Sequence, residues 1–423
     1  MTRADAIVIG ASVGGLAAAA YLARAGLNVL VLERKAAPPE PIGPFHALDP
    51  VMVSELRLAA RGLSFVHRGL PLALPGPGGI VPVADAARLS GDAAGLAALA
   101  RAARRLGGWW RDGTDGATPD SGRRARALFA RLSLTGADAW AGAHLHADAL
   151  IAALLFDATA GGFHVSEPGS ALALAWQAAQ GLGRLRGRPA MPAPGTLVWS
   201  LIKAAAAADF RCYAPVARIR LRQGAVAGVM LADGEEIDAP LIFSSLSRPA
   251  TAALMDAPAA APEVGEARLL LHFRERIALP PVRLVLAAHS GIHADAFEAA
   301  RAGRLPAALP MAFSPASADG TRIAVTLRPV PVPLPPDAKA LLAARALHAL
   351  SRHVPGAAAL VSGVALIPPG TAPRATLDRL LAPAAARIVM AQQGLYLCGA
   401  DAEPLPGLSG RAGRLAARLA LKS

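Results

Sequence analysis

The stretch that decides the fold is Ala6–Gly15, AIVIGASVGG, and the segments that follow it are Leu16–Ala25 and Asn28–Glu33, NVLVLE. Residues 6–10 form a short apolar run that is typical of a buried strand, and residues 13–25 are rich in alanine and leucine, which predicts a helix. Gly26 stands where a glycine often ends a helix. Residues 28–33 predict a second buried strand, so the three segments predict a β-α-β unit.

The turn between the first strand and the helix resembles a dinucleotide fingerprint. That fingerprint reads G-x-G-x-x-G, and here Gly10, Ser12 and Gly15 occupy its three positions. The first glycine allows a tight turn, the second allows a pyrophosphate to approach the backbone, and the third allows the helix to pack closely on the strand. Glu33 ends the second strand, where an acid accepts hydrogen bonds from a ribose. The pattern predicts a nucleotide site, and the alternative is a unit that keeps its fold but binds its dinucleotide weakly or not at all.

The middle of the chain contains helical and extended segments. Residues 85–110 are alanine-rich and predict a helix. Three apolar runs, at residues 214–222, 225–232 and 237–245, are separated by Gln223-Gly224 and Asp233-Gly234. Their alternation and turn residues predict a three-stranded antiparallel meander.

The C-terminal region predicts a second anion cradle. Gly394–Asp401 indicates a strand that leads into a glycine turn, and Arg411–Leu421 indicates a helix. A strand, a glycine-rich turn and a helix N-terminus together suit an anion. We therefore expect both ends of the chain to close on one ligand. Cys398 is interpreted as a small buried residue of the strand, because no adjacent base would make it a nucleophile.

Composition limits the function classes. The 423 residues are 54% hydrophobic and only 17% charged, which allows large cores. The net charge of +13 can favour anionic surfaces, although a compositional bias toward arginine explains it equally well. The arginines are not interleaved with aromatic residues, so nucleic-acid binding is not expected. The two cysteines, Cys212 and Cys398, lie far apart in the sequence, which excludes a disulfide framework. The histidine pairs His144/His146 and His289/His293 have no nearby third ligand, so a metal site is not expected.

The chain resembles the phytoene-desaturase-like flavoproteins along its whole length. These proteins are relatives of carotenoid desaturases and isomerases in the flavin amine-oxidase superfamily. The matching segments are residues 6–10, 18–26, 29–34, 46–50, 58–63, 167–171, 216–245 and 394–416. The resemblance implies an α/β fold with a Rossmann-type FAD-binding domain that carries the meander, and an interleaved α+β substrate domain. It assigns residues 1–75, 190–255 and 385–423 to the discontinuous FAD-binding domain, and residues 76–189 and 256–384 to the substrate-binding domain.

The resemblance also implies a set of FAD-binding residues. These are Gly10, Ser12, Gly14, Gly15, Glu33 and Arg34 for the ADP half, Val216 near the adenine, Gly399 and Asp401 near the ribityl chain and pyrophosphate, and Leu408 and Gly410 near the flavin ring. Two departures from the family stand out. Ser12 replaces a glycine, and the glycine pair that normally follows the acid of the second strand is absent.

The implied function is that of an FAD-dependent oxidoreductase, a desaturase or dehydrogenase, which transfers hydride between flavin and an apolar isoprenoid or lipid. No catalytic side chain is assigned, because such a hydride transfer needs no obligatory protein acid or base. The alternative is a flavin-poor relative that acts as a lipid-binding or scaffold protein. Amine oxidation is disfavoured, since the terminal segment offers only Tyr396 where an aromatic pair would be wanted. With no signal peptide or spanning helix expected, we predict a cytoplasmic protein that associates peripherally with the inner face of an anionic membrane. The oligomeric state is left open.

Overall fold

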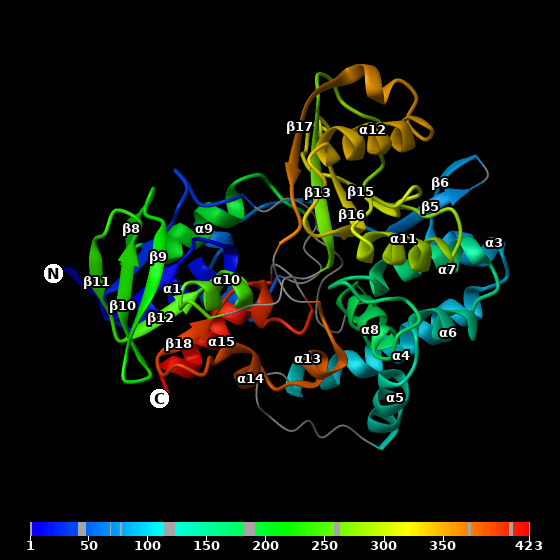
Figure 1. The fold of residues 1–423 in the computed structure, drawn as a ribbon. Helices are drawn as coiled ribbons and strands as arrows, with labels where there is room; N and C mark the ends of the chain where they lie inside the picture. The colour runs from blue at the N-terminus through cyan, green and yellow to red at the C-terminus, as the bar shows by residue number, and fades with distance from the viewer. Residues whose placement is uncertain are drawn as a thin grey trace.

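The structure is a computed structural model that describes residues 2–40, 48–67, 69–76, 78–113, 123–181, 191–257, 263–370, 374–405 and 409–422. It has two halves, shown side by side in Figure 1. One half contains both ends of the chain, and we call it the nucleotide half. The other half is built around a larger sheet and a group of helices.

A five-stranded parallel sheet forms the centre of the nucleotide half. Its order is β8 (Asp209–Arg211), β3 (Val29–Leu32), β2 (Ala6–Ile9), β12 (Leu241–Ser244) and β18 (Leu395–Leu397). The side chains of β2 alternate between two cores. Ala6 and Val8 pack toward the helices, whereas Ile7 and Ile9 pack toward a second sheet. A strand covered on both faces requires a continuous apolar run, and this is why the first strand could be predicted.

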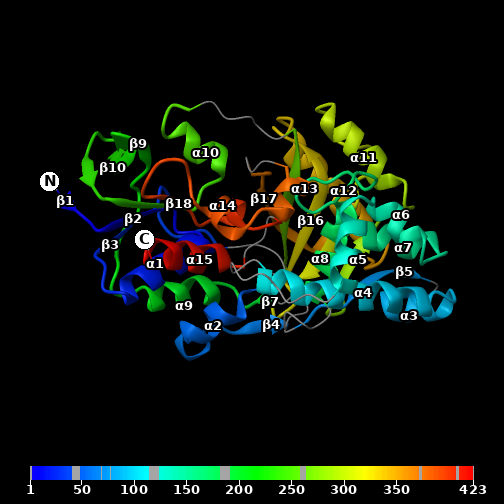
Figure 2. The same ribbon diagram turned by 90° about the horizontal axis from the view of Figure 1, so that it is seen from below.

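Three helices lie against one face of this sheet. They are α1 (Val13–Arg24), α9 (Thr196–Ala204) and α15 (Arg411–Ala420), and Figure 2 shows them side by side. The remaining helices of this half are α2 (Pro50–Glu55), α10 (Arg248–Ala253) and α14 (Ala384–Ile388). The first and last helices of the chain are therefore neighbours in space, as the pairing of the two terminal motifs predicts.

The predicted meander is partly wrong. The second sheet has the order β1 (Thr2–Arg3), β11 (Glu236–Asp238), β10 (Ala225–Leu231) and β9 (Val216–Arg222). Strands β9, β10 and β11 pair antiparallel as expected. The third run, however, divides at Pro240, and its second part forms β12 of the parallel sheet. Proline has no N–H to donate to a ladder, so a strand that changes sheets there loses no hydrogen bond.

The other half is built on a seven-stranded sheet. Its order is β17 (Val361–Ile367), β13 (Val264–Phe273), β16 (Arg322–Pro331), β15 (Met311–Pro315), β14 (Arg283–Leu286), β5 (Leu72–Gly76) and β6 (Gly79–Pro82). The β14–β5 pair is parallel and the other pairs are antiparallel. Strand β5 thus lies with the segments assigned to the substrate domain. A two-stranded sheet, β4 (Phe65–His67) with β7 (Met191–Pro192), completes the described strands.

Several helices of this half contact the seven-stranded sheet, and the others pack against helices or neighbouring segments. One group is formed by α3 (Val83–Leu89), α4 (Ala93–Gly113), α5 (Arg123–Ser133), α6 (Ala137–Gly142), α7 (Asp148–Ala158) and α8 (Ser170–Gly181). The others are α11 (Ile292–Arg301), α12 (Ala338–Ser351) and α13 (Leu377–Leu381). The helical segment predicted over residues 85–110 is divided into two helices, because Gly91 adopts a φ of 80° and separates α3 from α4. Within the described residues, no helix is both long and apolar enough to span a bilayer.

Candidate functional site

The turn after β2 is shaped by close contacts between backbones. Gly10 has a φ of 85°, in the left-handed region where a side chain is strained. A Cβ on Gly14 would lie 1.9 Å from the Cys398 carbonyl oxygen, and one on Gly15 would lie 2.2 Å from the Gly10 carbonyl oxygen. These glycines are therefore required by the packing of α1 on β2 and on the turn after β18, whether or not a nucleotide binds.

Ser12 caps helix α1. Its backbone is extended, and its Oγ accepts a hydrogen bond from the Gly15 amide at 3.3 Å. The cap therefore satisfies the Gly15 N–H, one of the donors in the first helical turn. Helix geometry leaves the N–H groups of Val13 and Gly14 without acceptors inside the helix, so they remain suited to a phosphate.

Glu33 ties the two strand ends together. Its side chain is 6% exposed, and one carboxylate oxygen accepts from the Ala11 amide at 2.9 Å. The other oxygen accepts from the Lys35 amide at 3.0 Å. The acid thus lies beside the turn as the fingerprint predicts. Its hydrogen bonds also stabilise the turn itself.

The C-terminal motif meets this turn. Gly410 precedes α15 with a φ of 73°, and a Cβ on Gly413 would lie 2.0 Å from the Gly14 carbonyl oxygen. Helices α1 and α15 therefore approach closely through glycines. Between the two turns lies a cavity of about 150 Å³. Its lining consists of Ser12, Gly14, Ser245, Cys398, Gly399, Ala400, Glu403, Gly410 and Ala412. We call this cavity the cradle.

Four of the residues expected at the FAD site line the cradle, namely Ser12, Gly14, Gly399 and Gly410. Gly10 in the turn, Gly15 in the first turn of α1 and Glu33 at the end of β3 lie outside the lining. Arg34 is exposed after β3. Val216 begins β9 in the second sheet. Leu408 lies outside the described residues. The roles of all these residues toward a ligand stay predictions.

Asp401 also lies outside the lining and is bonded by the chain. Its Oδ2 accepts from the Arg248 amide at 2.6 Å, and its Oδ1 lies 3.4 Å from the Arg379 guanidinium. Arg379 also donates to the Asp401 carbonyl oxygen at 2.8 Å. The side chain is buried, so these contacts fix the short helix that follows β18.

Glu403 is the charged residue in the described lining of the cradle, and the sequence analysis did not predict it. It is 7% exposed, and its Oε1 accepts from the Ser409 hydroxyl at 2.5 Å and from the Ala412 amide at 2.9 Å. Ser409 in turn accepts from the Arg411 amide at 2.9 Å. The carboxylate therefore occupies the N-terminus of α15, where the second anion cradle was predicted. Negative charge stabilises that end of a helix, but Glu403 lies eight residues before α15 along the chain, so the sequence pattern does not reveal this contact.

Buried arginines surround the backbone near Glu403. Arg387 is 5% exposed, and its Nε donates to the Ala402 carbonyl oxygen at 3.1 Å. Burial lowers the pKa of Arg387 to about 10, although the nearby Glu403 acts in the opposite direction. The guanidinium therefore remains charged at neutral pH and lies near the Glu403 carboxylate.

The residues of the cradle fit a dinucleotide in part. Val13 and Gly14 can present amides to one phosphate, and no side chain projects from Gly14 or Gly399. The cavity is, however, smaller than the roughly 300–1,000 Å³ of ordinary ligand sites. Glu403 also accepts the hydrogen bond of the Ala412 amide at the start of α15. The fit is good at the α1 end. At the α15 end a second ligand group would have to displace Glu403.

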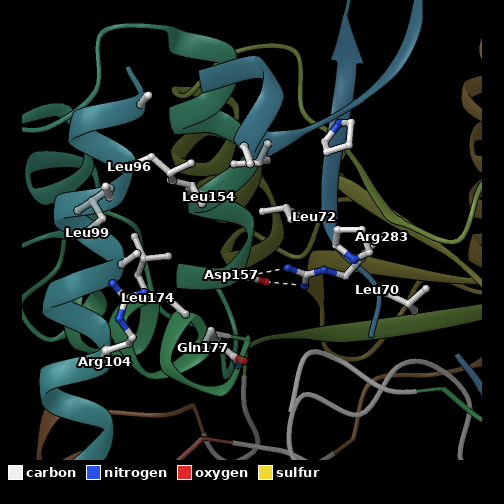
Figure 3. A pocket seen from close by; sticks show the side chains of 18 of the residues that line it. Leu70, Leu72, Leu96, Leu99, Arg104, Leu154, Asp157, Leu174, Gln177 and Arg283 are labelled. Carbon is white, nitrogen blue, oxygen red and sulfur yellow. Dashed lines mark hydrogen bonds and ion pairs between the residues drawn. The ribbon is translucent and has the colours of Figure 1, made fainter. Parts of the chain in front are cut away.

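A larger cavity lies in the other half. Its volume is about 530 Å³, and it is bounded by α3, α4, α6, α7, α8, β5 and β14 (Figure 3). Most of its described lining is leucine, alanine, valine and proline. We call it the apolar cavity. No residue of the cradle contributes to it.

A buried charge network reaches the apolar cavity through Asp157 and Arg283, which line it. Arg283 donates from both terminal nitrogens to the Asp157 carboxylate, at 2.6 Å and 2.5 Å. Arg328 lies 3.4 Å from the same carboxylate and donates to Glu266 at 2.6 Å. Burial alone would raise the pKa of Glu266, but Arg268 and Arg328 outweigh it and lower that pKa to about 2. Glu266 is therefore ionised, and Asp157 is paired with Arg283 and Arg328.

Comparisons with known proteins support the fold. A family model described as an NAD(P)-binding Rossmann-like domain matches residues 8–38. A search of curated proteins finds no match. Among solved structures, an oxidoreductase from Methanosarcina mazei is 15% identical over 100% of both chains, with a TM-score of 0.64.

Two further structures extend this comparison. Cyclohexylamine oxidase from Brevibacterium oxydans is 17% identical over 99% of this chain and 100% of its own, with a TM-score of 0.57. RAB GDI from Plasmodium falciparum is 10% identical over 98% and 97%, with a TM-score of 0.55. The finer resemblance to phytoene-desaturase-like proteins stays a prediction. The chain has an α/β fold with a Rossmann-type nucleotide-binding half, and it shares this fold with oxidoreductases that include amine oxidases.

Proposed function

We propose that the chain is an FAD-dependent oxidoreductase of the desaturase or dehydrogenase kind. The observation that carries the proposal is the convergence of two strand–turn–helix motifs, from opposite ends of the chain, on one cradle. When bound, FAD supplies the hydride-transfer chemistry. The chain's own contribution at the α1 end is a pair of amides and a glycine surface on which a phosphate can rest.

The apolar cavity supports an apolar substrate, such as an isoprenoid or another lipid. Its size lies within the range of ordinary small-molecule sites, and its walls are mainly aliphatic. We assign no catalytic side chain. The described lining contains no histidine, cysteine or tyrosine, so the residues present favour binding and exclusion of water over proton transfer.

The visible spectrum of the purified full chain tests this proposal. We expect flavin absorbance, or saturable binding when FAD is added to colourless protein. Parallel titrations with NAD and NADP determine whether the Rossmann-type half prefers another dinucleotide. A colourless protein that ignores FAD would refute flavin dependence.

The second candidate is a flavin-poor protein that binds lipid or acts as a scaffold. Glu403 favours it, because the carboxylate fills the α15 end of the cradle without any ligand. One similar structure is named as RAB GDI, not as an oxidase. The same titrations separate the candidates, since this one predicts lipid binding with no flavin binding under any condition.

We also propose that the chain binds the inner face of an anionic membrane in the cytoplasm. Helix α5 exposes Arg123, Arg124, Arg126 and Arg131, and Leu134 just after it is 77% exposed. The helix packs against α4 and α8, which line the apolar cavity. Basic residues near an anionic leaflet contribute about 1 kcal/mol each.

Liposome flotation tests the membrane proposal. We expect binding that needs anionic lipid, that high salt releases, and that Arg123→Glu with Arg124→Glu weakens. The control is Arg222→Glu with Arg304→Glu, because these two arginines are exposed elsewhere on the molecule. No flotation at low salt would contradict the proposal.

A further inference from the structure

Two neutral side chains that line the apolar cavity each have a buried polar atom without a hydrogen-bond partner. Trp140 on α6 is 4% exposed and Gln177 on α8 is 7% exposed, and both line the cavity. The Trp140 Nε1 and the Gln177 Oε1 are buried and have no hydrogen-bond partner. The Trp140 indole N–H is a donor, and the Gln177 carbonyl oxygen is an acceptor.

Buried polar atoms without partners are uncommon, because each one loses its hydrogen bonds to water on folding. Two such atoms in the wall of one cavity point to a ligand that completes them. The ligand must offer an acceptor to Trp140 and a donor to Gln177. A hydroxyl group offers both from a single oxygen.

An ammonium or a carboxylate head group would match this lining less well than a hydroxyl group. Asp157 is the single acidic residue of the described lining, and Arg283 and Arg328 neutralise it. An ammonium group would therefore find no free carboxylate, and it would face the half-buried Arg104. A carboxylate would suit Arg104 but would give Gln177 no donor.

The cavity also has a polar and an apolar end. In Figure 3 the side chains of Leu96 and Leu154 lie at one end, whereas Arg104 and Gln177 lie toward the other. A ligand with an apolar body and one polar head matches this arrangement. The body would be buried among the leucines and the head would be held near Gln177.

We propose that the apolar cavity binds a neutral apolar alcohol, whose hydroxyl accepts from the Trp140 indole and donates to the Gln177 carbonyl. That the alcohol is a substrate rests on the proposed function. Its binding does not depend on FAD, so the two ideas can fail separately. The inference departs from cyclohexylamine oxidase, which is named for an amine.

Calorimetric titration of the full chain with four matched ligands tests the proposal. The ligands are decanol, decyl methyl ether, decylamine and decanoate, which share one apolar body and differ in the head group. We expect decanol to bind about tenfold more tightly than the ether, which accepts but cannot donate. The amine and the carboxylate should bind more weakly than decanol.

Two variants and one control complete the experiment. Gln177→Leu should remove the preference for decanol over the ether, and Trp140→Phe should weaken both ligands. Gln392→Leu is the control, because Gln392 also has a buried Oε1 without a partner but lies outside the cavity. It should leave the preference unchanged.

Thermal unfolding shows whether the variants fold. Gln177→Leu should raise the Tm of the ligand-free chain, because it removes a buried carbonyl that has no donor. Equal binding of decanol and the ether would overturn the proposal, as would tighter binding of the amine or the carboxylate. A preference that survives both cavity variants would also overturn it. The absorbance spectrum reports flavin separately, so a failure of FAD binding cannot be mistaken for a failure of alcohol binding.

Discussion

Replacing Glu403 should free the hydrogen-bond donors at the start of α15, which the Glu403 carboxylate binds in the structure. In the structure its Oε1 accepts from the Ser409 hydroxyl and from the Ala412 amide at the start of α15. A ligand that needs those donors must first displace the carboxylate. A hydrogen bond to a charged group contributes about 1.5–3 kcal/mol. Removing it should therefore lower the Kd for FAD by about ten- to a hundredfold.

The two substitutions at this position should differ. Glu403→Ala leaves the Ala412 N–H buried without an acceptor, so the ligand-free protein should lose about 1–3 kcal/mol of unfolding free energy. Glu403→Gln keeps an acceptor oxygen and removes the charge, so its effects on stability and affinity should be smaller. FAD should recover part of the stability that Glu403→Ala loses, because it binds only the folded chain.

Titration followed by flavin fluorescence gives the Kd, and urea unfolding gives the stability. Glu235→Gln serves as the control, because Glu235 is an exposed carboxylate paired with Arg211 away from the cradle. If both Glu403 variants fold and bind FAD with the affinity of the unchanged protein, the carboxylate does not compete with the ligand. The interpretation of the cradle would then be wrong.

Three further predictions concern single acids and the helix cap. Glu33→Ala should weaken FAD binding by about 1.5–3 kcal/mol, and urea unfolding should show a loss of stability because the Ala11 amide loses its acceptor; an unchanged Kd would remove Glu33 from the site. Ser12→Gly should raise flavin occupancy or leave it unchanged. The lost helix cap should lower the unfolding free energy by a few tenths of a kcal/mol. Loss of flavin would instead show that Ser12 donates to a phosphate. The folded-state pKa of Glu266 is about 2, below its ordinary value of 4.5, so its stabilising contribution is complete above about pH 5 and is lost as the pH falls toward 2. Urea unfolding across that range should show a flatter pH dependence for Glu266→Gln, and identical slopes would contradict the assignment.

The sequence predicts strands β2, β3 and β18 of the parallel sheet well, because these strands are buried on both faces. An apolar run such as residues 6–10 has few alternatives once a glycine turn and an alanine-rich helix follow it. The same reasoning fails at residues 237–245, where the hydrophobic pattern is continuous but the chain changes sheets at Pro240. Periodicity shows which residues are buried, and it does not show which partner strand buries them.

The candidate sites show the same limit. Glu403 has an ordinary sequence context, and its position at the start of α15 depends on a turn that the pattern does not specify. Trp140 and Gln177 read as core residues, since nothing in the sequence shows that their polar atoms lack partners. These features depend on the three-dimensional positions of helices that are distant along the chain.

The glycine fingerprint is therefore weaker evidence for a ligand than for a fold. Gly14 and Gly15 are required by the Cys398 and Gly10 carbonyl oxygens, and Gly413 is required by Gly14 itself. A larger residue at any of these positions would separate elements of the nucleotide half, so folding alone explains why glycine stands there. A chain could lose its dinucleotide and still keep every one of these glycines. Glu403 has no comparable role in packing, because its contacts are with the donors that a ligand would use. The affinity of the Glu403 variants for FAD is consequently more informative about function than any substitution of a glycine.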